Sequence, residues 1–367
     1  MSGAGRRFAL TLVDELARAG VTDACLAPGS RSAPLALALA EQPGIAVHVH
    51  LDERSAAFFA LGAAKRSGRP VVVLCTSGTA AANFHPAVLE ADHARTPLLV
   101  LTADRPPELR GTGANQAADQ LKLYGPAVRW FCEVGVPADD PAAGRYWRSL
   151  ASRAWAEATG PPAGPVHLNL AFAEPLVPLD PADEAEPAEG RPGGAPWTAA
   201  PRGVPAAAPE DVDALVEAVR NTPRGLLVAG WGVDLDPLAV DGFLAASGWP
   251  VLADPLSGAR RGPAAISAYD GLLRAPGFAG GHHPELVVRV GGAPTSKALT
   301  AWLDPSVPQV LVDPDGGWMD PGRSASLRLT ADPSALLAAV AERLGGPAPA
   351  RPWLEGWLAA DRMAREA

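Results

Sequence analysis

Cysteine, lysine and long apolar runs are scarce in this sequence of 367 residues, and each scarcity excludes a class of protein. The three cysteines, at positions 25, 75 and 132, are widely spaced and contain no CxxC pair, which excludes a disulfide framework and a cysteine zinc site. Such cysteine usage is typical of a reducing compartment, so we expect a cytoplasmic protein. No run approaches the ~20 apolar residues of a bilayer-spanning helix, and the N-terminal segment does not resemble a signal peptide.

Basic residues are outnumbered by acidic ones. Lys and Arg total 31 against 40 Asp and Glu, which gives a net charge of −9. Nucleic acid is therefore not an expected partner, because its affinity comes largely from phosphate neutralisation by a basic face. The sequence also lacks a Walker A loop, an HExxH helix and a GxSxG elbow, which excludes three common classes of enzyme. No set of His, Cys and acidic residues has metal-ligand spacing, so we expect no metal ligand in this chain.

Alternating strand and helix patterns fill the first half of the chain. With 48% hydrophobic and 19% charged residues, the composition is that of a globular protein of two to three domains. Apolar runs of strand length alternate with stretches of helical length, and this pattern predicts a parallel sheet covered by helices on both faces. The expected strands are 24–27, 45–51, 71–75, 97–101, 128–134 and 166–170, and the expected helices are 8–19, 33–41, 53–65, 76–94 and 142–158.

Proline and glycine, 39 and 38 residues, concentrate at two borders. Residues 179–209 are rich in Pro, Ala, Gly and acidic side chains, which predicts a linker. A second αβ unit follows, so the predicted fold is two consecutive three-layer αβα domains with parallel sheets, at 1–178 and 210–345. The string GWGVD in the second unit is an incomplete GxGxxG, and it predicts a packed turn rather than a dinucleotide site. In the last segment, 346–367, we expect a linker and the first helix of a further domain.

Four strand ends in the first half carry chemically active side chains. In open α/β sheets, ligands bind beyond the carboxyl ends of the strands. Taken singly, each stretch has an ordinary explanation: PGSRS and TSGT suit helix starts, and Glu53 suits a first helical turn, where the dipole favours an acid. Their convergence on one sheet edge predicts a ligand site. The stretches are Pro28–Ser32, Asp52–Arg54, Thr76–Thr79 and Asp104–Glu108, the last leading into Gly113–Gln116.

These stretches resemble the thiamine-diphosphate-dependent enzymes, and within them the 2-succinyl-5-enolpyruvyl-6-hydroxy-3-cyclohexene-1-carboxylate synthases of menaquinone biosynthesis. The resemblance covers about residues 5–178, and the ADRPPEL…GANQ segment is its most specific part. The second unit is similar more loosely, through RVGGAPTSKAL, to the Rossmann-like central domain of the family. The matching stretches of the first unit are PGSRSAPLALAL, HLDERSAAFFALG, TSGTAAANFHPAVLEA, LTADRPPELRGTGANQ and GPVHLNLAFAEPL.

The resemblance implies that residues 1–178 form the pyrimidine-side domain for thiamine diphosphate. The family's catalytic glutamate corresponds to Glu53, whose carboxylate is hydrogen-bonded to N1′ of the cofactor's aminopyrimidine. That role requires an apolar pocket in which the carboxyl group shares a proton with the cofactor. The flanking Leu51 and the run 56–59 are apolar, as this role requires. The resemblance further implies cofactor contacts from Pro28, Ser77, Gly78 and Asn83.

The resemblance also implies two small-molecule substrates, both of them dicarboxylates. 2-Oxoglutarate loses carbon dioxide, and the succinyl carbanion adds to isochorismate in a 1,4 fashion. Because both substrates are negatively charged, an acidic protein must place cations locally to bind them. The planar guanidinium group of arginine suits carboxylates. Lys297 corresponds to a substrate-side lysine of the central domain. Some relatives carry a second cation where this chain has Ala298. The alternative interpretation of Lys297 is an exposed cation on a helix. The isochorismate-side residues correspond to Ser30, Arg31, Arg105 and Gln116.

The family's diphosphate and its Mg²⁺ (or Mn²⁺) are held by a third domain that carries GDG and a downstream Asn. The sequence contains no GDG, so we expect an incomplete chain that is inactive alone. The complete form is expected to be a homodimer or homotetramer, or to use a separate diphosphate-binding subunit. Two alternatives stay open: another thiamine-diphosphate 2-oxoacid decarboxylase or acetolactate synthase relative, which ADRPPE and GANQ disfavour, and a non-catalytic fragment or subunit.

Overall fold

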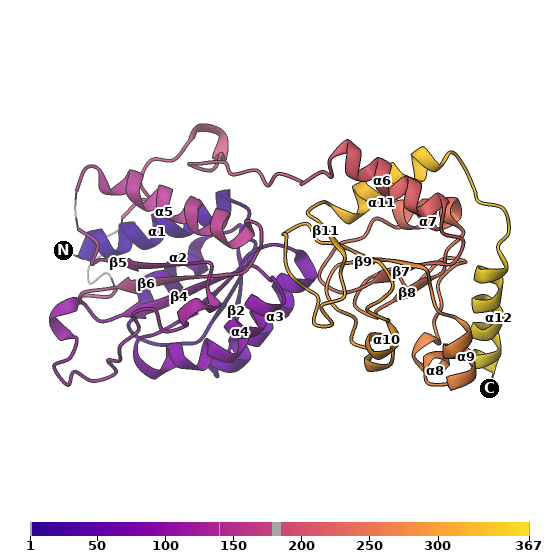
Figure 1. Cartoon of the computed structure of the whole chain (residues 1–367). Helices are drawn as coiled ribbons and strands as arrows, with labels where there is room; N and C mark the ends of the chain where they lie inside the picture. Colours follow the sequence, from indigo (N-terminus) through magenta and orange to yellow (C-terminus); the bar gives the residue numbers. More distant parts are fainter. Residues whose placement is uncertain (1, 139, 178–184, 367) are drawn as a thin grey trace. The chain divides into compact units, whose positions relative to one another are not determined.

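The chain folds into two compact units, 1–202 and 203–367 (Figure 1). The computed structural model describes residues 2–138, 140–177 and 185–366. Within these ranges, no helix combines the length and the apolarity needed to cross a bilayer. Each unit is a parallel sheet between two layers of helices, so the predicted fold class is confirmed.

The first unit contains a six-stranded sheet in the order β2-β1-β3-β4-β6-β5, with every pair of neighbours parallel. The first strand in the sequence, β1, has β2 on one side and β3 on the other side. The connections that leave β1 and β3 therefore run to opposite faces of the sheet, and we call the place where they separate the divergence point. Open α/β sheets bind ligands at such a point. The strands are β1 (Asp23–Leu26), β2 (Ala46–Val49), β3 (Val71–Cys75), β4 (Leu98–Asp104), β5 (Trp130–Val134) and β6 (Pro165–Ala171).

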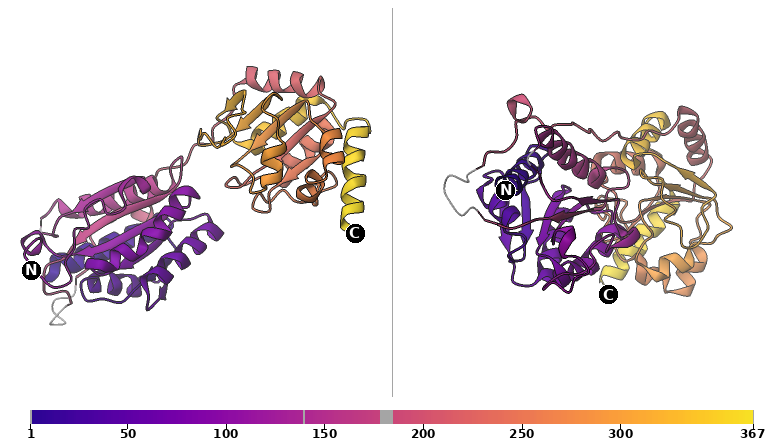
Figure 2. Two further views of the ribbon diagram at one scale, coloured as in Figure 1. Left: turned by 60° about the horizontal axis from the view of Figure 1, so that its bottom comes forward. Right: turned by 90° about the vertical axis from the view of Figure 1, so that its left-hand side faces the viewer.

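Two helical layers cover this sheet, as Figure 2 shows. On one face, α1 (Ser2–Arg18), α2 (Ala33–Glu41) and α5 (Ala143–Thr159) bury a cluster that includes Phe8, Leu35 and Trp147. The other face is covered by α3 (Glu53–Ser67), the 3₁₀ helix η1 (Gly78–Phe84) and α4 (His85–His93). We expected one helix from TSGT to residue 94, but the first turns are 3₁₀ and the α-helix starts at His85, with Pro86, a residue suited to a first turn, as its second residue. Two short 3₁₀ turns, η2 (Pro107–Leu109) and η3 (Gly125–Ala127), lie in the loop region between β4 and β5.

The second unit contains a five-stranded parallel sheet in the order β11-β10-β9-β7-β8. Its strands are β7 (Gly225–Ala229), β8 (Val251–Ala253), β9 (Leu286–Val290), β10 (Gln309–Val312) and β11 (Leu327–Leu329). One face packs on α6 (Pro209–Arg220), α7 (Pro237–Ser247) and α11 (Pro333–Leu344). The opposite face packs on α8 (Tyr269–Leu273), α9 (Pro276–Gly281), α10 (Lys297–Trp302) and α12 (Pro352–Glu366).

Part of the predicted linker is instead packed against α1 and α5. The Ala188 N–H donates to Thr11 Oγ1 at 2.9 Å, and the Trp197 N–H donates to the buried carboxylate of Glu15. A 3₁₀ turn, η5 (Pro192–Gly194), lies between these two contacts. Residues 178–184 of the predicted linker lie outside the described ranges. Pro/Gly-rich composition indicated a linker, but backbone hydrogen bonds to α1 make residues 185–198 part of the first unit.

The helix α12 belongs to the second unit and does not begin a further domain as we expected. Trp357 is fully buried, with ring-centroid distances of 5.0 Å to Phe278 and 5.9 Å to Trp302. The buried Asp361 accepts a hydrogen bond from the Ala268 N–H at 2.7 Å. The physical reason is that Phe278 of α9 and Trp302 of α10 form an aromatic surface that Trp357 of α12 covers.

Candidate functional site

The loops after β1 and β3 pack against each other at the divergence point of the first sheet. A Cβ atom on Gly29 would lie 2.3 Å from Cβ of Thr76, so only glycine permits this approach. Gly78 has a φ of +86°, and a Cβ atom there would lie 3.1 Å from the Gln116 carbonyl oxygen. Three of the predicted stretches, 28–32, 76–79 and 113–116, therefore meet at this edge.

Direct hydrogen bonds join Gln116 to the loop after β3. Ser77 Oγ donates to the Gln116 carbonyl at 2.8 Å, and Gln116 Nε2 approaches Thr76 Oγ1 at 3.4 Å. Gln116 itself has a φ of +57°, an uncommon conformation for a residue other than glycine. Pro28 and Ser30 are exposed on the adjoining loop. The structure thus brings together five of the residues that the sequence indicated: Pro28, Ser30, Ser77, Gly78 and Gln116.

Glu53 is the first residue of α3, next to the same edge. Asp52 caps the helix by accepting from the Ser55 N–H at 3.2 Å, which leaves the Glu53 side chain free of capping. The Glu53 carboxylate is partly exposed and has no hydrogen bond or ion pair within the described part of the chain. Burial, together with the charge of Glu53, holds the pKa of the Cys75 thiol well above its usual range, which places Glu53 near the end of β3.

Large apolar side chains flank Glu53 in the sequence, and they are open to solvent. The exposed fractions are 95% for Leu51, 46% for Phe58 and 45% for Phe59. Ala56 and Ala57, by contrast, are buried in the core of the first unit. The apolar flanks expected for Glu53 are present, but the described residues of this chain do not enclose it. We call the exposed apolar side chains of Val49, Leu51, Phe58 and Phe59 the α3 apolar face.

The two predicted isochorismate-side arginines differ in their freedom. Arg31 is 2% exposed: its Nη1 donates to the Phe172 carbonyl at 2.8 Å, and its Nη2 pairs with Glu174 at 3.1 Å. Arg105 donates from Nη2 to the Asn115 carbonyl at 2.9 Å. In both side chains the Nε atom is buried without a partner in the described structure. Arg31 therefore ties the β1 loop to the end of β6, while Arg105 braces the loop that carries Gln116.

A buried polar network below these loops was not predicted from the sequence. The Gly78 N–H donates to Gln120 Oε1 at 2.8 Å, and Gln120 Nε2 donates to Asn169 Oδ1 at 2.8 Å. Asn169 Nδ2 in turn donates to Asp104 at 2.8 Å and to Glu133 at 2.6 Å. Burial raises the pKa of Asp104, although the hydrogen bond from Asn169 opposes the rise. The available signal was a polar residue, Asn169, inside the apolar run of β6.

Arg110 closes this network from the loop side. Its Nη2 lies 3.0 Å from Asp104 Oδ2 and 2.6 Å from Glu133 Oε1, and its Nε donates to the Arg105 carbonyl at 3.1 Å. The guanidinium thus connects two buried or partly buried acids to the backbone of Arg105. This connection fixes the start of the 105–116 loop relative to β4 and β5.

The remaining predicted residues lie away from these contacts. Asn83 is exposed on η1 and donates to the Thr79 carbonyl at 3.3 Å. Lys297 is the exposed first residue of α10 in the second unit, where Ser296 caps the helix through the Leu299 N–H at 3.0 Å. GWGVD is a packed turn as predicted, because a Cβ atom on Gly230 would lie 1.7 Å from the Gly292 carbonyl oxygen.

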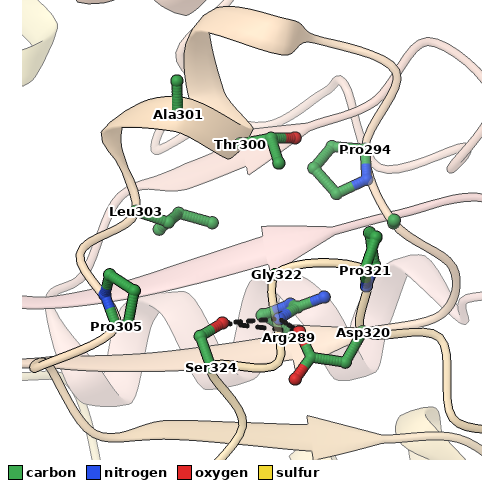
Figure 3. Close-up of a pocket in the computed structure, with 11 residues that line it drawn as sticks. Arg289, Pro294, Thr300, Ala301, Leu303, Pro305, Asp320, Pro321, Gly322 and Ser324 are labelled. Carbon is green, nitrogen blue, oxygen red and sulfur yellow. Dashed lines mark hydrogen bonds and ion pairs between the residues drawn. The ribbon is translucent and has the colours of Figure 1, made fainter.

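A pocket of about 170 Å³ in the second unit contains none of the predicted residues (Figure 3). Its charged members pair with each other, since Arg289 Nη1 lies 2.6 Å from Asp320 Oδ1 and Nη2 donates to the Met319 carbonyl at 3.0 Å. We interpret this pair as a structural contact. Among the described residues, no group of three or more His, Cys, Asp or Glu side chains is arranged to hold a metal ion.

Two family models match the chain, one for each unit. Residues 6–123 match the thiamine pyrophosphate enzyme, N-terminal TPP binding domain, and residues 195–365 match the model described as middle domain of thiamine pyrophosphate. The second match includes α12, in agreement with its packing.

Curated relatives match nearly the whole chain. The chain is 50% identical over 340 residues to a 2-succinyl-5-enolpyruvyl-6-hydroxy-3-cyclohexene-1-carboxylate synthase of Thermobifida fusca, covering 89% of this chain and 58% of that protein. Proteins of the same name match at 46% identity in Haloarcula marismortui, over 97% of this chain and 63% of the relative, and in Geobacillus kaustophilus, over 89% and 57%. The chain thus spans about three fifths of the length of these relatives. From both matches and the fold, the chain belongs to the thiamine pyrophosphate enzymes and carries their N-terminal and middle domains.

Proposed function

We propose that this chain supplies the pyrimidine-side and central domains of a synthase that joins a succinyl group from 2-oxoglutarate to isochorismate, in menaquinone biosynthesis. The observation that carries the proposal is Glu53, which lies near the end of β3 and whose carboxylate has no hydrogen bond or ion pair in the described part of the chain. It gains weight because the chain is 50% identical to a relative named for this product. The three free cysteines favour the cytoplasm as the place of the reaction.

The residues at the sheet edge fit thiamine diphosphate. Gly29 and Gly78 leave the loops without side chains where they approach each other, and Glu53 retains a carboxylate with no protein partner in the described ranges. Bound there, the cofactor would supply the electron sink that decarboxylation of a 2-oxoacid requires. Glu53 would share a proton with the aminopyrimidine N1′, and the α3 apolar face would favour that shared state once it is covered. Further contacts would come from Pro28, Ser77, Gly78 and Asn83.

The proposed partners of the substrate carboxylates are cations and amides. Arg105 and Gln116 would bind isochorismate from the loop braced by Arg110, with Ser30 on the adjoining loop. Arg31 would act through its unpartnered Nε and by holding the β1 loop in place. Lys297 of the central domain would bind a substrate carboxylate as a point charge.

The side chains that bind the diphosphate and Mg²⁺ would come from residues outside this sequence. We propose that they belong to a third domain, either in the remainder of a longer protein or in a separate subunit. In the complete form, a homodimer or homotetramer, that domain would cover Glu53 and its apolar surroundings.

The test is a chimera that joins residues 1–367 to the remaining part of the Thermobifida fusca relative. We expect it to release carbon dioxide from 2-oxoglutarate and to consume isochorismate, while Glu53→Gln reduces carbon dioxide release by roughly 100-fold or more. The melting temperature should change little, because Glu53 makes no hydrogen bond or ion pair in the described part of the chain. Preference for pyruvate over 2-oxoglutarate would favour the decarboxylase or acetolactate synthase alternative, and near-normal turnover by Glu53→Gln would refute the role of Glu53.

A further inference from the structure

A hollow in the first unit lies between α1, the start of α5 and the packed segment 188–197. Its volume is about 460 Å³, within the range of small-molecule pockets. It contains none of the residues of the proposed active site. The charged side chains that line it are Arg7, Arg145, Glu189 and Arg191.

The wall of this hollow is fixed by buried contacts. A Cβ atom on Gly144 would lie 2.6 Å from Cβ of Ala188, and one on Gly190 would lie 2.9 Å from the Arg18 guanidinium. These two glycines therefore let the segment lie directly on α5 and on the side chain of Arg18. Arg18 Nη1 also donates to the Arg191 carbonyl at 3.0 Å. The hollow is thus a feature of the folded unit, and its shape does not depend on a free loop.

Beneath this wall, buried and partly buried acids of α1 pair with arginines. The buried Arg148 pairs with Asp14 and, at 3.0 Å, with Glu15, and Ser152 Oγ donates to Glu15 at 2.8 Å. These acids are therefore used by Arg148 and are not available to neutralise the arginines of the hollow. Arg18 is likewise paired with Asp14, at 2.7 Å.

The arginines of the hollow itself have no acidic partner among the described residues. The side chains of Arg7 and Arg145 make no ion pair or hydrogen bond in the part of the chain that the structure describes. Arg191 is held in place, with its guanidinium 4.4 Å from the centre of the Trp197 ring and its Nε donating to the Trp197 carbonyl at 3.2 Å. Among the described residues that line the hollow, three arginines stand against one acid, Glu189, which is a formal excess of two positive charges.

We propose that this hollow binds a small organic dianion whose charges are carboxylate or phosphate groups. Three guanidinium groups from three different segments can approach such a ligand from separate sides, and arginine forks match both kinds of anion. The volume exceeds what an inorganic ion needs, and the Trp197 ring adds an apolar wall for a carbon skeleton. Repulsion among the cations is relieved when the dianion is bound, so binding stabilises the first unit.

Calorimetric titration of the full chain with succinate and with glycerol 3-phosphate tests the proposal, in a buffer of low ionic strength without phosphate. We expect one of the two to bind with a dissociation constant below about 1 mM, and the uncharged diamide of succinate not to bind. Each of Arg7→Gln, Arg145→Gln and Arg191→Gln should weaken that binding roughly tenfold, because a charge-assisted contact is lost. Which ligand binds distinguishes a carboxylate site from a phosphate site.

Two variants serve as controls. Arg66→Gln removes an exposed charge on α3 and should bind like the wild type. Arg105→Gln removes a cation of the proposed active site, so unchanged binding in this variant separates the hollow from that site. If neither anion binds with a dissociation constant below about 1 mM, or if the three hollow variants bind as tightly as the wild type, the proposal is wrong.

Discussion

Gln120 is a single side chain that joins three segments at the candidate site. It accepts from the Gly78 N–H at 2.8 Å and donates to the Ala103 carbonyl at 3.1 Å and to Asn169 at 2.8 Å. Gln120→Ala should lower the free energy of unfolding by about 2 kcal/mol, because buried polar groups lose their partner. Urea denaturation measures this loss. Gln42→Ala, which removes an exposed amide that accepts from the Gly44 N–H, is the matched control and should change little; equal losses in both variants would contradict the assigned role.

His167 is a second single residue with a testable effect, a dependence of the free energy of unfolding on pH. Burial lowers the pKa of His167 from 6.5 to about 3, and its Nδ1 has no described partner that could receive a proton from the ring. The folded pKa lies below the unfolded value, so the unfolded state binds more protons between these values, and stability falls as pH decreases through that window. From pH 7.5 to 4.5 the wild type should lose about 2–3 kcal/mol through this group.

The variant His167→Leu isolates that contribution. It keeps Thr102 Oγ1 paired with Asn169 at 2.8 Å and removes the titrating ring. Urea denaturation at several pH values should therefore give a flatter profile for the variant than for the wild type. Parallel profiles would show that His167 is protonated in the folded state without penalty.

Residues of the site differ in how far the sequence predicted them. Glu53, Ser77 and Gly78 follow strands directly, so the topology of a parallel sheet places them at one edge. Gln120 and Arg110 lie in a long loop, and their partners come from β4, β5 and β6. Such contacts depend on the tertiary path of the loop, which neither periodicity nor motif spacing encodes.

At the scale of elements, α12 shows how aromatic residues decide where a helix belongs. Trp357 is fully buried, whereas Met363 on the same helix is 72% exposed. Trp357→Ala should destabilise the second unit by about 3–5 kcal/mol, and Met363→Ala should remain within about 0.5 kcal/mol of the wild type. Chemical denaturation followed by tryptophan fluorescence compares the two. A small effect of Trp357→Ala would mean that α12 is only loosely attached.

Strands and helices of the two sheets were largely predictable because their apolar runs are short and bounded by Gly or Pro. The helix 33–41 and the strand 71–75 have the predicted bounds. The exceptions have a common cause. Residues 185–198 are rich in proline, and α12 lies at the end of the sequence, so neither was expected to pack in a unit. Hydrogen bonds to other elements hold both of them in the folded units.

At the scale of the whole molecule, the proposed function assigns this chain one side of a cofactor site. We expect thiamine diphosphate to bind this chain weakly and without dependence on Mg²⁺, because no described cluster of acidic side chains can hold the metal. Calorimetry with and without Mg²⁺ measures both properties. Tight binding that requires Mg²⁺ would place the diphosphate site within this sequence and overturn the proposed division of labour.

The packing of Trp197 against Glu15 has a consequence for synthesis on the ribosome. The helix α1 is translated first, yet the backbone groups that complete its buried surface are those of Ala188 and Trp197, about 180 residues later. A nascent chain that has emerged only to residue 178 leaves Glu15 and Arg148 without these partners. The N-terminal unit therefore reaches its full stability only when residues 185–198 have left the exit tunnel, and translation pauses before that point would prolong the exposure of α1 to proteases and chaperones.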